Sequence, residues 1–229
     1  MDSDPKSEGK GHSPERKLSQ SWCVWEKYQT AFIQNASNYQ ENIEKIYTFE
    51  TLDKFALLWK YTTYSQPSDL LFDIETNATK KFRISEEDSE EKIVDGLLLF
   101  KEGVLPKWED PANHKGCSIS CELSGMNGRS IDKLWKDILF AVIGQNFPFS
   151  DCVNGFRLLD RLKKHNLVKL ELWMSCGTAA YKPESEAHKQ NGEIVDAITK
   201  HAHTIISRTQ EVPFHSIVKK EHFIASKVN

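Results

Sequence analysis

The sequence predicts an α+β protein, in which an antiparallel β-sheet carries helices on one of its faces. Two observations lead to this prediction: three segments have the periodicity of amphipathic helices, and seven short segments outside them have the composition of strands. The strand-like segments follow one another in runs and do not alternate one-to-one with the helices, which favours antiparallel pairing. With 229 residues, 39% of them hydrophobic, one domain has enough apolar side chains for a sizeable core.

The predicted helices are residues 51–61, 130–144 and about 183–206. In the first, TLDKFALLWKY, apolar residues recur at i, i+3, i+4 and i+7 behind Thr51, which can act as the N-cap. In the second, SIDKLWKDILFAVIG, we expect Ser130 to cap the start and Gly144 to end the helix. The apolar face of the third is expected to hold Ile194, Ala197, Ile198, His201, Ala202 and Ile205.

Seven segments are expected to form strands, because they are rich in β-branched, aromatic and alternating apolar residues. They are WCVWEKY, ENIEKIYTF, DGLLLFKEG, CSISCEL, GFRLLDRLKK, VKLELWM and FHSIVKKEHF. Residues 1–20 are polar and charged and are predicted to be a disordered tail, which leaves a folded domain over residues 21–229. The acidic stretch 73–92 is predicted to be a long surface loop within that domain.

Charge and cysteine content exclude several classes of function. A net charge of −3 argues against a non-specific nucleic-acid binder that works by releasing counterions from many phosphates. Five scattered cysteines do not form a disulfide framework, and His114, Cys117 and Cys121 lack a fourth ligand, so no metal is expected. No apolar run is long enough to span a membrane, and we expect the protein in the cytoplasm, with the nucleus as an alternative.

Basic residues gather on one face of a predicted hairpin, GFRLLDRLKKHNLVKLELWM. Strand alternation sends apolar side chains to the face under the helices and directs Arg161, Lys163 and Lys169 to the opposite face. Facing like charges repel, so such a patch is best explained by an anion, such as a phosphate chain, that binds there. A solvated polar face with three incidental cations is the alternative.

Trp108 and Glu109 stand together in LPKWEDPANHKG, a proline-flanked connection that follows a predicted strand. An exposed aromatic ring beside a carboxylate can stack on a nucleic-acid base and accept hydrogen bonds from the base edge. Guanine offers two adjacent donors, N1–H and the exocyclic amine, which match the two oxygens of one carboxylate. In the alternative interpretation, Trp108 anchors the core and Glu109 is a solvated loop charge.

Several of these stretches resemble the translation initiation factor 4E family, which binds the 7-methylguanosine cap of messenger RNA. The resemblance rests on WEDPANHKG after FKEGVLP, on WCVWEKY, FETLDKFALLWKY, IDKLWKDILFAVIGQNF and VKLELW, and it covers residues 21 to about 222. It implies a curved antiparallel sheet with about three helices on the convex face and the cap in the concave slot. It also implies that the ligand is the 7-methylguanosine triphosphate cap, and no cofactor is expected. The sequence has no glycine-rich phosphate loop and no nucleophile–base motif, so no enzymatic activity is expected.

The resemblance assigns roles to individual residues. Tyr39 and Trp108 are implied to clamp the base, Glu109 to bind its edge, and Trp173 to pack near the N7 methyl group. The phosphates are implied to meet Arg161, Lys163, Lys169 and Lys227. The partner-binding positions on the convex face are implied to be Leu52, Ala56, Trp59, Lys136 and Leu139.

The partner positions depart from the family pattern, because Ala56 stands where the family has an exposed tryptophan. An aromatic anchor of that kind often dominates the energetics of an interface. The resemblance as a whole implies a monomer that binds capped messenger RNA, together with an initiation scaffold of the 4G type or a 4E-binding protein. A cap-binding translational repressor, and an interaction module that has lost cap binding, are the alternatives.

Overall fold

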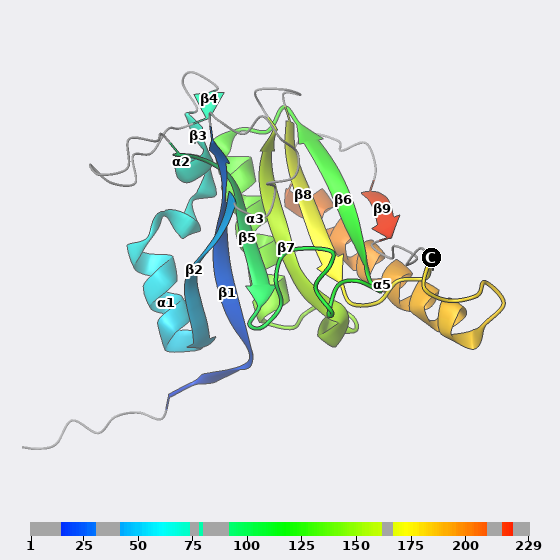
Figure 1. The fold of residues 1–229 in the computed structure, drawn as a ribbon. Coiled ribbons are helices and arrows are strands. Elements are labelled where there is room, and N and C mark those ends of the chain that lie inside the picture. The colour runs from blue at the N-terminus through cyan, green and yellow to red at the C-terminus, as the bar shows by residue number, and fades with distance from the viewer. Residues whose placement is uncertain are drawn as a thin grey trace, which may run out of the picture.

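The computed structural model describes residues 15–30, 42–73, 78–79, 92–161, 167–209 and 217–221. Seven strands in these ranges form one antiparallel sheet in the order β2-β1-β5-β7-β8-β6-β9 (Figure 1). The strands are β1 (Lys17–Thr30), β2 (Ile43–Thr51), β5 (Lys92–Lys101), β6 (Cys117–Ser124), β7 (Val153–Arg161), β8 (Leu167–Met174) and β9 (Ile217–Glu221). Each of the seven predicted strand segments overlaps one of these strands, so the predicted α+β class is confirmed.

The helices lie on one side of the sheet, which curves around them (Figure 1). They are α1 (Leu52–Tyr61), the short α2 (Pro67–Leu71), α3 (Gly128–Ile143) and α5 (Glu186–Thr209). Single 3-10 turns occur at Thr63–Ser65 and Ser150–Cys152, and β3 (Phe72–Asp73) pairs with β4 (Ala78–Thr79) in a separate ribbon. The three long predicted helices are confirmed, whereas α2 was not expected from the sequence.

The helix ends agree with the sequence at two of three predicted caps. Thr51 accepts a hydrogen bond from the Lys54 backbone N–H, and Gly144 ends α3, as expected. The N-cap of α3 is Asn127, three residues before the predicted Ser130, whose backbone N–H donates to the Asn127 side chain. Asparagine and serine are about equally good caps, so their local preferences do not decide between the two positions.

The two faces of the sheet have different chemistry. On the helix side, alternate strand residues such as Val24, Leu97, Phe156 and Leu170 join the helices in one large apolar cluster. On α5 the fully buried stripe consists of Val195, Ile198, Ala202 and Ile206, so it is rotated from the predicted one. The opposite, concave face carries a smaller aromatic cluster and the charged side chains described below.

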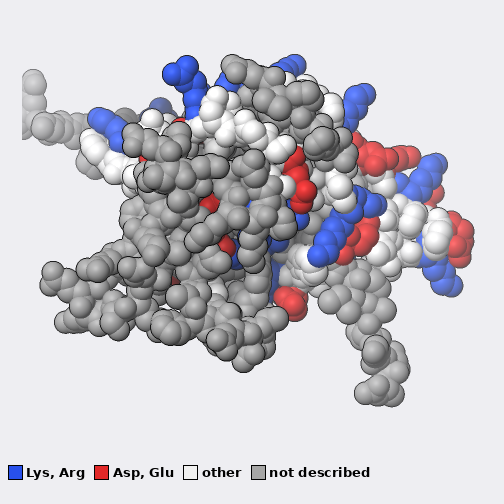
Figure 2. All heavy atoms as spheres, turned by 90° about the horizontal axis from the view of Figure 1, so that it is seen from above, with Lys and Arg blue, Asp and Glu red and all other residues white. Residues whose placement is uncertain are grey.

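The predicted ends and loops fall largely outside the described residues. Strand β1 begins at Lys17, so the first strand reaches into the predicted tail 1–20. Most of the predicted acidic loop 73–92 lies outside the described ranges. No helix in the described part of the chain is long and apolar enough to cross a membrane. Positive and negative side chains are interspersed on the surface that carries α5 (Figure 2), in agreement with the small net charge.

Candidate functional site: a cleft on the concave face

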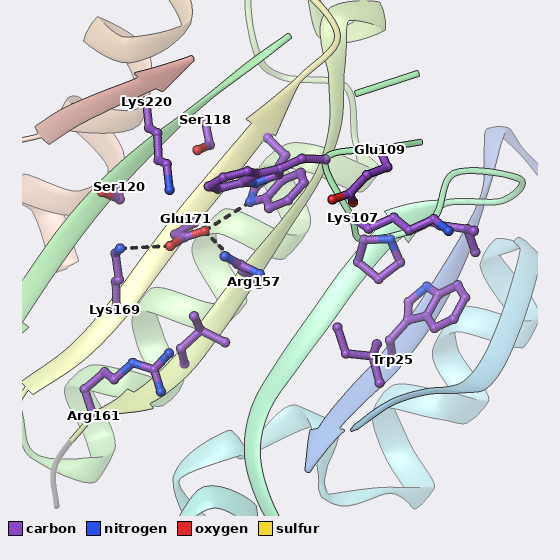
Figure 3. Close-up of a pocket in the computed structure, with 16 residues that line it drawn as sticks. Trp25, Lys107, Glu109, Ser118, Ser120, Arg157, Arg161, Lys169, Glu171 and Lys220 are labelled. Carbon is purple, nitrogen blue, oxygen red and sulfur yellow. Dashed lines mark hydrogen bonds and ion pairs between the residues drawn. The ribbon is translucent and has the colours of Figure 1, made fainter. Parts of the chain in front are cut away.

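A cleft of about 660 Å³ opens on the concave face, between the β5–β6 connection and strands β6, β7, β8 and β9. It is lined by Trp25, Ile43, Leu105, Pro106, Lys107, Trp108, Glu109, Ser118, Ser120, Arg157, Leu159, Arg161, Lys169, Glu171, Trp173 and Lys220. Aromatic and acidic groups thus share one hollow with a series of cations. Figure 3 shows Glu109, Lys107 and Trp25 on one side of the view, and Glu171, Arg157 and Lys169 joined by dashed lines on the other.

The base of the cleft is a buried aromatic cluster. Trp173 is 1% exposed and packs edge-on against Phe100, with ring centroids 5.6 Å apart at an interplanar angle of 78°. Gly155 pairs with Trp173 across β7 and β8, and a Cβ atom at Gly155 would lie 2.7 Å from the Phe100 ring. The missing side chain at residue 155 therefore allows the two rings to pack closely on the sheet.

Trp108 lies above this base on the β5–β6 connection. Its ring is half-buried, and its centroid lies 6.2 Å from that of Trp173. The Lys220 ammonium from β9 lies 3.6 Å from the centroid of the Trp108 ring, a cation–π geometry. Glu109 is exposed beside it and lines the cleft. Trp108 packs against the small buried cluster of Leu98, Phe100 and Trp173 and also lines the cleft, so it is not a fully buried core residue.

A buried hydrogen-bond network holds the segment that carries Trp108. Asp110 accepts hydrogen bonds from the backbone N–H groups of Leu105, at 2.9 Å, and Ala112, at 2.8 Å. Asn113, 0% exposed, donates to the carbonyls of Leu105, at 2.9 Å, and Lys107, at 3.0 Å. These contacts fix the chain on either side of Trp108, so the position of the indole depends on two polar residues that follow it.

A second residue far along the chain completes this network. Asn154 on β7 donates to the Asn113 side-chain oxygen at 2.9 Å and to the Ala112 carbonyl at 2.8 Å. Asn154 is 3% exposed. The connection that carries Trp108 is therefore tied to the central strand of the sheet and not only to its own turn.

Glu171 and Arg157 form a buried ion pair across β8 and β7. The Arg157 Nε atom donates to Glu171 Oε2 at 2.6 Å, and Lys169 Nζ lies 2.9 Å from Oε1. Burial acts to raise the pKa of the Glu171 carboxyl, but the charges of Arg157 and Lys169 outweigh it and hold that pKa at about 2. The carboxylate therefore stays charged throughout the physiological range.

Arg161 lies at the other end of β7, close to a second buried carboxylate. Its Nη1 atom is 4.0 Å from Asp95 Oδ2, and Asp95 also pairs with Lys27. The Arg161 side chain is 32% exposed and that of Lys169 is 28% exposed, so both can reach a ligand in the cleft. This end of the cleft is suited to an anion.

The structure brings together five of the eight ligand-binding residues that the sequence implied. Trp108, Glu109, Trp173, Arg161 and Lys169 line the same cleft. Tyr39, Lys163 and Lys227 lie outside the described residues, so their roles stay predictions.

The sequence did not indicate that Trp25, Arg157 and Lys220 line the cleft. It also did not indicate that the Glu171 carboxylate lies among the basic residues there. Arg157 could have been found, because it precedes Arg161 by four residues and therefore lies on the same face of the strand. Lys220 follows Lys219 near the end of the chain, and no local pattern indicates which of the two faces the cleft.

His114, Cys117 and Cys121, which stand close together in the sequence, make separate contacts in the structure. The exposed His114 ring contacts the Pro111 carbonyl through Nδ1, at 2.8 Å, and the buried Cys117 thiol donates to the Cys176 carbonyl. Within the ranges that the structure describes, no group of three or more His, Cys, Asp or Glu side chains is arranged to hold a metal ion. The five cysteines are free thiols.

On the convex face, Leu52, Ala56 and Lys136 are exposed, and their assignment to a partner surface stays a prediction. Leu139 is only 2% exposed and belongs to the core, so its assignment to a partner surface is wrong. Its neighbour Phe140 is 42% exposed and lies on the outside of α3.

Trp59 is half-buried in an aromatic cluster between α1 and α3 on this convex face. Its ring centroid lies 6.0 Å from that of Phe55 and 5.2 Å from that of Phe140. Leu52, 40% exposed, precedes Phe55 and Trp59 by three and seven residues and so lies on the same side of α1. Together these side chains form an apolar patch on the side of the molecule away from the cleft.

Comparison with known proteins gives consistent matches. The model of the family "Eukaryotic initiation factor 4E" matches residues 17–226. The chain is 28% identical over 189 residues to "Eukaryotic translation initiation factor isoform 4E" of Prunus domestica, which is 82% of this chain and 75% of the relative. It is 24% identical over 168 residues to "Eukaryotic translation initiation factor 4E1" of Drosophila melanogaster, which is 72% of this chain and 52% of that longer protein.

A solved structure shares the fold. A schistosome initiation factor 4E, in complex with m7GpppA and 4E-BP, superposes with a TM-score of 0.61 at 19% identity. The superposition covers 91% of this chain and 89% of the schistosome chain.

Proposed function

The chain belongs to the eukaryotic initiation factor 4E family, and we propose from this membership and from the cleft that it binds the 7-methylguanosine cap of messenger RNA in translation initiation. The observation that carries the proposal is the pairing of Trp108 with Glu109 at a cleft whose far end holds Arg161 and Lys169. This arrangement suits a ligand that is cationic and flat at one end and anionic at the other.

The base end of the cleft fits a methylated guanine. Methylation at N7 gives the ring a positive charge, and a cation over an indole gains about 2 kcal/mol when desolvated. The Lys220 ammonium lies 3.6 Å from the centroid of the Trp108 ring, so this ring already holds one cation against its face. The Glu109 carboxylate is exposed next to it and can accept the N1–H and amine donors in a charge-assisted pair.

A retention experiment tests cap binding. We expect the protein to bind immobilised 7-methyl-GTP and to be eluted by free 7-methyl-GTP but not by GTP. Trp108→Ala should weaken binding about 5- to 150-fold, the equivalent of about 1 to 3 kcal/mol for one stacked base. Glu109→Gln removes the charge from the edge contact and should cost about 1.5 to 3 kcal/mol.

Matched controls separate the site from general effects. Trp59→Ala removes an indole from the convex face, and Glu102→Gln removes a carboxylate from the exposed turn after β5, outside the cleft. Both variants should be retained like the wild type. Cap binding is refuted if the wild type is not retained, or if Trp108→Ala and Glu109→Gln bind as the wild type does.

We also propose that the apolar patch around Phe55, Trp59 and Phe140 binds a helix of an initiation scaffold or of a 4E-binding protein. The exposed Leu52 extends the patch on α1, and apolar groups at helical spacing suit a helix in a groove. Co-precipitation with Phe140→Asp as the negative variant tests this contact. Recovery of a scaffold favours a role in initiation, whereas recovery of a different partner in its place favours repression. We also propose a cytoplasmic location, with the nucleus as the alternative, and fractionation of cells tests it.

A further inference from the structure

Glu171 is a buried acid in the part of the cleft that is otherwise basic. It is 6% exposed, and both of its carboxylate oxygens are engaged. Oε2 accepts hydrogen bonds from Arg157 Nε at 2.6 Å and from Trp173 Nε1 at 3.2 Å, while Oε1 lies 2.9 Å from Lys169 Nζ. Movement of this carboxylate would break three contacts, so it is a fixed negative charge (Figure 3).

The contacts of Glu171 engage two of the cations that would otherwise face an anionic ligand. Arg157 is 7% exposed, with its guanidinium carbon 4.8 Å from the centroid of the Trp173 ring. A ligand phosphate that reached Arg157 would therefore compete with Glu171 for the same donor. Lys169 is more accessible, but its ammonium already neutralises the other Glu171 oxygen.

Simple geometry gives the distance between this carboxylate and a bound phosphate. If a phosphate oxygen takes a second proton of the Lys169 ammonium at about 2.9 Å and a tetrahedral angle, it lies about 4.7 Å from Glu171 Oε1. Two like charges at that distance weaken binding about fourfold at the dielectric constant of water, and several hundredfold at an effective value of about 20. The cleft is open to solvent, so we expect an effect of about tenfold.

We propose that Glu171 is a specificity-determining residue that reduces the contribution of the cap phosphates, so that this chain selects its ligand mainly through the methylated base. This inference rests on the proposed cap binding and concerns the same cleft. The Glu171 carboxylate is already bonded to Arg157 and Lys169 before a ligand binds, and its negative charge repels a phosphate that approaches Lys169. The opposite possibility is that Glu171 only positions Arg157 and Lys169 for the phosphates. In that case, removal of the Glu171 charge should weaken phosphate binding instead of strengthening it.

The test compares 7-methylguanosine with 7-methyl-GTP, because only the second ligand carries phosphates. Dissociation constants are measured by tryptophan fluorescence for the wild type and for Glu171→Gln, which removes the charge with little change in shape. We expect the affinity ratio of triphosphate to nucleoside to rise about tenfold in Glu171→Gln. The affinity for the nucleoside should stay within about twofold of the wild type.

Two further variants control for charge and folding. Glu122 lies on β6, where it pairs with Lys169 of β8, and its side chain is exposed and outside the cleft. Glu122→Gln therefore removes a charge from the same face and should leave the affinity ratio of triphosphate to nucleoside unchanged. The double variant Arg157→Gln/Glu171→Gln removes both charges of the buried pair, leaves no unpaired buried cation, and should keep the wild-type ratio. It serves as the test if Glu171→Gln does not fold.

The outcomes separate the two proposals. A ratio that is unchanged or lower in Glu171→Gln, or a tenfold lower ratio in the double variant, overturns the role of Glu171 and leaves cap binding in place. A wild type that binds neither 7-methylguanosine nor 7-methyl-GTP overturns cap binding itself.

Discussion

Replacement of Asn113 by alanine should both destabilise the fold and weaken the proposed cap binding, although Asn113 does not line the cleft. The side chain is fully buried and makes three hydrogen bonds, two donated to the carbonyls of Leu105 and Lys107 and one accepted from Asn154. Each such bond contributes about 1 kcal/mol net, so Asn113→Ala should cost about 3 kcal/mol of unfolding free energy. For a domain of this size the melting temperature should fall by about 6 to 12 °C.

The effect on binding follows from the segment that Asn113 fixes. Without the two donated bonds, the backbone on either side of Trp108 is less restrained and must be ordered when a ligand binds. Ordering one residue costs about 1 to 2 kcal/mol, so the affinity for 7-methyl-GTP should fall about tenfold. Thermal unfolding by circular dichroism and a fluorescence titration with 7-methyl-GTP measure the two quantities on the same sample.

The controls for this prediction are an exposed asparagine and the bonded partner. Asn146→Ala, on the surface after α3, should change the unfolding free energy by less than about 0.5 kcal/mol. Asn154→Ala combined with Asn113→Ala should be less destabilising than the sum of the single changes, because the two side chains share a hydrogen bond. A melting temperature for Asn113→Ala within about 2 °C of the wild type, with unchanged affinity, would refute this account of the segment.

Two further predictions concern ionisable groups. Because the folded pKa of Glu171 is lowered from 4.5 to about 2, its charge stabilises the fold above about pH 4.5, and that contribution is lost as the pH falls toward 2. Between pH 5 and pH 2, the unfolding free energy of the wild type should fall by about 3 kcal/mol more than that of Glu171→Gln, as measured by urea unfolding. An equal fall in both proteins would contradict the lowered pKa of Glu171. The neighbouring Cys176 thiol and the Lys101 charge lower the pKa of the Cys152 thiol, so iodoacetamide should modify Cys152 first of the five cysteines at pH 7. Mass spectrometry of the modified peptides measures the order of modification, and Cys176→Ser should slow the reaction at Cys152. Earlier modification of a buried cysteine than of Cys152 would argue against this interpretation.

The sheet and the two faces of its hairpin could be predicted from the sequence, because alternation with a period of two is a strict geometric rule. That rule correctly placed Arg161, Lys169 and Trp173 on the face opposite the helices. It could not show that Arg157 lies directly opposite Glu171, since this pairing depends on the register of β7 and β8. A shift of register would have paired different charges without altering either strand's pattern.

Besides the register of β7 and β8, the sequence could not reveal the long-range hydrogen bonds that hold the segment around Trp108. The segment WEDPAN indicated a site through Trp108 and Glu109, whereas Asp110 and Asn113 looked like ordinary loop residues. Their importance comes from burial and from Asn154, a residue 41 positions away from Asn113. Polar side chains in a connection reveal such a role only when the fold shows what covers them.

The cleft holds two acids that a sequence cannot rank, and burial decides which of them a ligand can use. The Glu171 carboxylate is 6% exposed, and its oxygens are already bonded to Arg157, Trp173 and Lys169. Glu109 is exposed beside the Trp108 ring. The acid that can bind a cationic base therefore lies at one end, and the acid that opposes a phosphate lies at the other. If that division is correct, Glu109→Gln should weaken 7-methylguanosine and 7-methyl-GTP equally, whereas Glu171→Gln should affect only the ligand that carries phosphates.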